Sequence, residues 1–122
     1  MKKSEFDYQP SLMEQEGNVV RINFDAEQVE KEMPAEDGGQ PVVRKVWEAY
    51  VVRVEEPLTR SRIVDATVNA GYPRDKMDAV INNYLLNQKD AEAKQEFNDM
   101  QAWRKRTKQL ADEVLAAVGE QG

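Results

Sequence analysis

The sequence predicts an α+β fold in which a long N-terminal β-hairpin is followed by a short helical hairpin and a long C-terminal helix. Three observations lead to this class. Residues 18–26 alternate between apolar and polar side chains, residues 42–55 form a second β-type run, and the residues after Pro57 carry apolar stripes at helical spacing. We divide the chain into a β-hairpin region at 18–56 and a three-helix region at 57–122, which together make one structural domain.

The first predicted strand has one apolar face, as expected for a half-buried strand. Val20, Ile22, Phe24 and Ala26 alternate with Arg21, Asn23 and Asp25. A segment rich in glycine and proline follows at 34–41, and these residues favour a turn and end strand pairing. The second strand then runs from Val42 to about Glu55.

The second predicted strand has apolar residues on both faces. One face carries Val42, Val46, Tyr50, Val52 and Val54, and the other carries Val43, Trp47, Ala49 and Val51. A strand that is apolar on both faces is central or covered, but one hairpin supplies only two strands and is marginal in water by itself. We therefore expect the chain to bury part of this surface by forming a homo-oligomer.

Three helices are predicted after Pro57. Thr59 is a typical N-cap for the first helix, and Gly71 fits its end. The second helix starts at Pro73 or Asp75, and its apolar stripe contains Met77, Val80, Ile81, Tyr84 and Leu85. The third helix starts near Asp90 and reaches about Val118, a length of roughly 42 Å at 1.5 Å per residue.

Residues 1–17 show no periodic pattern, because charges, Pro10 and Gly17 interrupt the scattered apolar side chains. We interpret this segment as a mobile N-terminal arm. In an alternative interpretation, its apolar residues anchor a neighbouring subunit: Phe6, Tyr8, Leu12 and Met13.

The composition excludes several kinds of chemistry. The chain of 122 residues contains neither cysteine nor histidine, so the usual zinc and copper sites, thiol catalysis and imidazole-based triads are excluded. Phosphate-binding and nucleophile-elbow motifs are absent from the sequence as well. We predict no cofactor, no metal site and no catalytic residue.

The net charge of −6 argues against nonspecific binding to nucleic acid or to anionic membranes. The net negative charge comes from residues 1–56, because residues 57–122 carry equal numbers of acidic and basic side chains. A basic partner surface would meet the chain at residues 1–56, although acidic loops that keep the chain soluble are the simpler interpretation. We find no signal peptide and no apolar span long enough for a membrane. The expected location is therefore cytoplasmic or virion-associated.

The candidate interface residues combine the two tryptophans, their apolar neighbours and part of the basic cluster at 103–108: Trp47, Tyr50, Val51, Trp103, Arg104 and Arg106. Tryptophan and arginine are enriched among residues that dominate binding energy. Simpler interpretations stand beside this one. The tryptophans can be core anchors, and the basic side chains can form a solvated helix face or dock the acidic first half of the chain.

The segments "EEPLTRSRIVDATVNAGYPRDKMDAVINNYLLNQ" and "EFNDMQAWRKRTKQLADEVL" resemble small phage and prophage proteins of gut bacteria. Shared features are a short strand region, a Leu-Thr helix start, a Tyr-led turn and a "MQAWR" helix, and together they cover roughly Val46 to Leu115. The resemblance implies a tail-associated or assembly role, with a phage structural protein as partner. It transfers no functional residue.

These observations lead to a non-enzymatic protein–protein interaction protein as the leading hypothesis. The alternative is a DNA-binding regulatory protein that uses the helical hairpin at 60–86, although only Arg74 and Lys76 supply positive charge near the start of its second helix. A third hypothesis, a hydrolase built on carboxylates, requires two acids that converge in a pocket.

Overall fold

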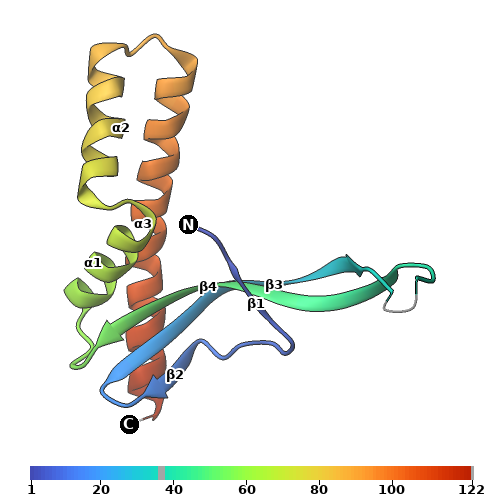
Figure 1. Ribbon diagram of the computed structural model, residues 1–122. Coiled ribbons are helices and arrows are strands. Elements are labelled where there is room, and N and C mark those ends of the chain that lie inside the picture. The colour runs from blue at the N-terminus through green and yellow to red at the C-terminus, as the bar shows by residue number, and fades with distance from the viewer. Residues whose placement is uncertain (36–37, 122) are drawn as a thin grey trace.

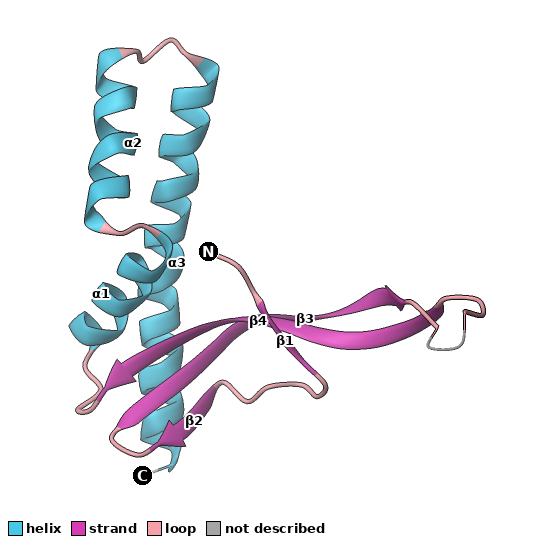
Figure 2. Ribbon diagram, in the orientation of Figure 1, coloured by secondary structure: helices cyan, strands magenta, loops and turns pink. Residues whose placement is uncertain are grey.

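The protein is an α+β molecule in which four strands precede three helices, as the sequence predicts (Figures 1 and 2). Its computed structural model describes residues 1–35 and 38–121, so Glu36 and Asp37 of the predicted turn lie outside the described residues. The elements are β1 (Ser4–Phe6), β2 (Met13–Glu16), β3 (Val19–Met33), β4 (Val42–Glu55), α1 (Arg60–Gly71), α2 (Arg74–Leu86) and α3 (Ala91–Gln121).

The central feature is the long antiparallel hairpin of β3 and β4. The strand order is β1-β4-β3-β2, so each short N-terminal strand lies at one outer edge of the hairpin. Near its base, the hairpin pairs apolar residues whose side chains point toward the helices: Val20 with Val54, Ile22 with Val52, and Phe24 with Tyr50.

The helices begin and end close to the predicted residues. The side chain of Thr59 accepts a hydrogen bond from the backbone N–H of Arg62, which caps α1 as predicted. Asp90 caps α3 in the same manner, because its carboxylate accepts a bond from the backbone N–H of Ala93 at 3.1 Å. The 31 residues of α3 span roughly 46 Å, and the helix runs past both α1 and α2.

The main core lies where the base of the hairpin meets α1 and the C-terminal half of α3. Its fully buried members come from all three elements: Ile22, Ile63, Leu110, Ala111 and Val114. The N-terminal half of α3 packs against α2 instead, with Val80 and Met100 buried and the rings of Tyr84 and Phe97 stacked at 4.3 Å. Helix α2 therefore extends beyond the sheet and contacts α3 (Figure 1).

A β-bulge interrupts β3 between Phe24 and Glu27. Two residues of β3, Asp25 and Ala26, lie opposite one residue of β4, and Asp25 adopts a left-handed backbone with φ of 54°. The sequence prediction placed Ala26 on the apolar face with Phe24, and this is wrong because the extra residue breaks the alternation. Ala26 is exposed.

Residues 1–17, interpreted from the sequence as a mobile arm, instead contribute β1 and β2 to the sheet. Ion pairs fix the first part of this segment on the hairpin: Lys3 with Glu27, Glu5 with Lys31, and Asp7 with Arg44. Hydrogen bonds to Glu5 and Glu48 raise the pKa of Lys31 above its ordinary value. These partners lie far away in the sequence, which is why local periodicity gives no sign of them.

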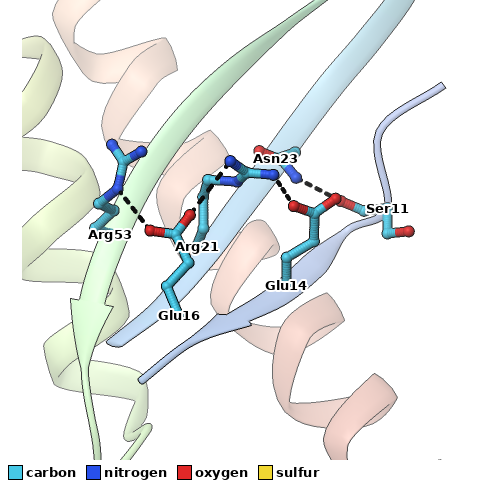
Figure 3. Close-up of polar contacts among 6 residues, drawn as sticks. All are labelled: Ser11, Glu14, Glu16, Arg21, Asn23 and Arg53. Carbon is cyan, nitrogen blue, oxygen red and sulfur yellow. Dashed lines mark hydrogen bonds and ion pairs between the residues drawn. The ribbon is translucent and has the colours of Figure 1, made fainter. Parts of the chain in front are cut away.

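The second part of this segment is fixed at the base of the hairpin. Arg21 forms ion pairs with Glu14 and Glu16 of β2, and Arg53 of β4 shares Glu16 (Figure 3). The Arg53 side chain is largely exposed, and exposed ion pairs contribute about 0–1 kcal/mol each. The Arg21 pairs are half-buried, and the docking of β2 also uses the apolar contacts of Leu12 and Met13 with the core and the buried Asn23.

The segment between β1 and β2 covers part of the hairpin face that points away from the helices. Because the two strands lie on opposite edges, residues 7–12 must cross β4 and β3. Asn23 points to that face and donates from Nδ2 to the carbonyl of Ser11 at 2.8 Å (Figure 3). Its backbone N–H donates to the carbonyl of Leu12. The chain itself thus supplies cover that the sequence argument assigned to a second copy, and it leaves Trp47 and Val51 half-buried.

We expect Asn23→Ala to lower the free energy of unfolding by about 1–3 kcal/mol, because the substitution removes a buried hydrogen bond and leaves the Ser11 carbonyl without this donor. Urea denaturation followed by circular dichroism measures this change. The control is Asn82→Ala on the exposed side of α2, which should leave stability unchanged or slightly higher. Equal stabilities of the two variants would contradict a structural role for Asn23.

Candidate functional site

The distal part of the hairpin projects away from the helices as a two-stranded ribbon (Figure 1). We define the projecting ribbon as residues 29–33 and 42–46, which pair from Val29 with Val46 to Met33 with Val42. Strand β2 pairs only with residues 19–22 and β1 only with residues 47–49, so within the described chain neither edge of the projecting ribbon pairs with a further strand. Open edges of this kind can pair with another chain.

The end of the projecting ribbon is apolar and exposed. Met33, Val42 and Val43 are 42%, 62% and 57% exposed. Met33 and Val42 pair across the hairpin and share one face of the ribbon, and Val43 follows on the other face. Exposed apolar side chains on both faces at the end of a projecting element are typical of protein–protein contacts. Beside them, Glu30, Glu32 and Lys45 are exposed and have no ion-pair partner among the residues the structure describes.

A second surface feature is a groove of about 730 Å³ where α1, α2 and α3 meet. We call it the three-helix groove. Its apolar lining comes from Val64, Val68 and Met77, and the volume lies in the range of pockets that hold ligands or protein side chains. Helix α2 packs on the N-terminal half of α3, and the groove is the open space where α1 joins these two helices.

The rim of the three-helix groove carries charges of both signs. Three basic side chains, Arg74, Arg104 and Lys108, exceed the two acidic ones, Asp65 and Asp78. In the described part of the chain, none of the five forms an ion pair. The rim therefore has an excess of one positive charge, whereas most other arginines of this protein are in ion pairs.

Tyr72 lies at the edge of the same groove, between α1 and α2. Burial, together with the nearby carboxylates of Asp99 and Glu96, raises the pKa of Tyr72 above its ordinary value. Like an ordinary tyrosine hydroxyl, that of Tyr72 is neutral at physiological pH and can donate a hydrogen bond. The groove can thus bind a segment that combines apolar side chains with acidic or carbonyl oxygens.

Three of the candidate interface residues meet at a corner of the core. The rings of Tyr50 and Trp103 lie 5.3 Å apart and both contact Phe24, and the indole Nε1 of Trp103 donates to the carbonyl of Thr67 at 3.1 Å. Arg106 donates to Asp25 and to Glu113. Trp103 is a core anchor in this arrangement, and Arg106 docks the acidic first half of the chain onto α3.

The other candidate interface residues lie elsewhere. Arg104 lines the three-helix groove, one helical step from the corner that holds Trp103. Trp47 and Val51 alternate with residues that face the helices and therefore belong to the opposite face of the sheet, where both are half-buried. The six residues do not form one surface.

The described residues hold no group of three or more acidic side chains placed to bind a metal ion. Among the helices of the described chain, none is both long enough and apolar enough to cross a bilayer. Comparisons with protein-family models, with curated proteins and with solved structures found no match to the chain.

Sequence reasoning missed the two features that stand out in the structure. The exposed apolar end of the projecting ribbon consists of residues counted as part of a continuous strand, and only the position of Met33, Val42 and Val43 next to the turn indicates that they lie beyond the core. The three-helix groove combines residues from three helices, and no spacing within one helix reveals it.

We expect Gly71→Ala to destabilise the protein by about 1–3 kcal/mol, as overpacking does in other cores. A Cβ at this position would lie 2.6 Å from Nε1 of Trp103, whose position is fixed by its bond to Thr67. Thermal denaturation and tryptophan fluorescence measure the effect. In Gly119→Ala, the new Cβ meets no atom within 4 Å, so this control should be neutral or slightly stabilising. Comparable stability of the two variants would show that Trp103 is not fixed against α1.

Proposed function

We propose that the protein is a non-enzymatic interaction protein that associates with copies of itself through the projecting ribbon. The resemblance to phage and prophage proteins supports a tail-associated or assembly role as the setting. The observation that carries the proposal is the apolar end of the ribbon, where Met33, Val42 and Val43 are exposed on an element that leaves the body of the protein.

The location of these residues supports a binding role over a stabilising one. The main core lies at the base of the hairpin, and its buried members on β3 extend only from Val20 to Phe24. A ribbon that continued past the core for stability alone would be expected to carry polar residues on both faces, because isolated hairpins gain little in water. Apolar residues at its end are instead expected where another protein surface covers them.

The DNA-binding alternative requires the helical hairpin at 60–86. This hairpin carries little net charge where it would meet a phosphate backbone. Arg74 and Lys76 are interleaved with Asp75 and Asp78 in the first turns of α2. Affinity for DNA depends mainly on the number of phosphates that basic side chains neutralise. The balance of charge therefore favours a protein partner.

We expect a variant with Met33→Gln, Val42→Thr and Val43→Thr to lose self-association while keeping its fold. Threonine retains a high preference for strands, so the ribbon should still form. Sedimentation velocity from low micromolar to high micromolar concentration should show oligomers of the unmodified protein and a dissociation constant at least tenfold weaker for the variant.

A matched control replaces Leu85 and Leu86 with glutamine at the far end of α2, where the two leucines are 60% and 86% exposed. This variant removes a similar amount of exposed apolar surface and should associate like the unmodified protein. An unmodified protein that stays monomeric throughout the concentration range would rule out the proposed function.

A further inference from the structure

We propose that the three-helix groove is the binding site for the projecting ribbon of a second copy of the chain. This inference rests on the proposed function and specifies the surface that receives the ribbon. The contact is then between two different surfaces, the ribbon of one copy and the groove of the next.

The charges of the two surfaces are complementary. The groove rim holds three basic and two acidic side chains, and the described ribbon holds two acidic side chains and one basic side chain without ion pairs, Glu30, Glu32 and Lys45. The remaining charged residues of the described ribbon are already neutralised within the chain, Lys31 by Glu5 and Glu48 and Arg44 by Asp7. Glu30 lies directly opposite Lys45 in the hairpin, so the charge left over on the ribbon is that of Glu32, and the groove rim has one positive charge in excess.

The apolar residues of the two surfaces also match in character. The groove offers the aliphatic side chains of Val64 and Val68 and the flexible thioether of Met77. Met33, Val42 and Val43 are of similar size and shape, and thioether and aliphatic groups pack well against one another. Tyr72 at the groove edge supplies a neutral hydroxyl that can donate to a backbone carbonyl on the open edge of the ribbon.

The ribbon cannot fill the groove of its own chain. It leaves the body of the protein in a direction away from the helices, whereas the groove lies between α1, α2 and α3 (Figure 1). The contact must therefore be intermolecular and head-to-tail. Contacts of this type produce a ring if the rotation between copies closes and a filament if it does not.

The first test reverses the groove charges with Arg74→Glu and Lys108→Glu, two exposed positions at which a change of charge should not disturb the core. We expect self-association, measured by sedimentation velocity, to weaken at least tenfold. The control reverses Lys89 and Lys105, which carry the same charge and are exposed but do not line the groove, and it should associate normally. Adding Glu30→Lys and Glu32→Lys to the groove variant should restore association.

The second test mixes the groove variant, which keeps its ribbon, with the ribbon variant Met33→Gln, Val42→Thr and Val43→Thr, which keeps its groove. Each should be monomeric alone, and the mixture should form a one-to-one dimer that cannot extend further. Circular dichroism of each variant verifies its fold.

A groove variant that still associates by itself would overturn the ribbon-to-groove contact, as would a mixture that stays monomeric. The first of these results leaves the proposed function intact if the ribbon variant alone loses association, because the ribbons then contact each other. A monomeric unmodified protein overturns both proposals together.

Discussion

The whole architecture depends on the contact between the base of the β3–β4 hairpin and the C-terminal half of α3. Ile22 from the sheet, Ile63 from α1 and Leu110 and Val114 from α3 are completely buried there. Burying an aliphatic side chain contributes about 1.5–3 kcal/mol, and this core contains the densest set of such residues. The projecting ribbon and the pair formed by α2 and the N-terminal half of α3 extend from this junction in different directions (Figure 1).

This arrangement explains why parts of the molecule face solvent with apolar side chains. A chain of 122 residues has enough apolar material for one core, and the structure concentrates it at the junction. Beyond the junction, α2 packs against the N-terminal half of α3, whereas the end of the projecting ribbon is exposed. Of the two surfaces that we assign to association, the ribbon end lies outside the core, and the three-helix groove borders it through Val64 and Ala66, which pack against the core.

The sequence predicts the elements well where periodicity is local. Thr59 and Asp90 cap helices as expected, and the alternation from Val20 to Phe24 identifies the buried face of β3. Prediction fails where the decisive contacts are distant in sequence. The pairing of residues 1–17 with the hairpin depends on partners such as Glu27, Lys31 and Arg44, and the groove depends on three helices at once.

The β-bulge at Asp25 has a consequence for how such a protein can diversify. It lies between the anchored base of the hairpin and the free ribbon, and Arg106 of α3 ties it to the helices. Bulges bend and twist the strand that contains them, so the direction in which the ribbon leaves the body is set at this point. Residues 29–33 and 42–46 can then vary in chemistry, and with it in binding preference, while the orientation of the ribbon stays the same.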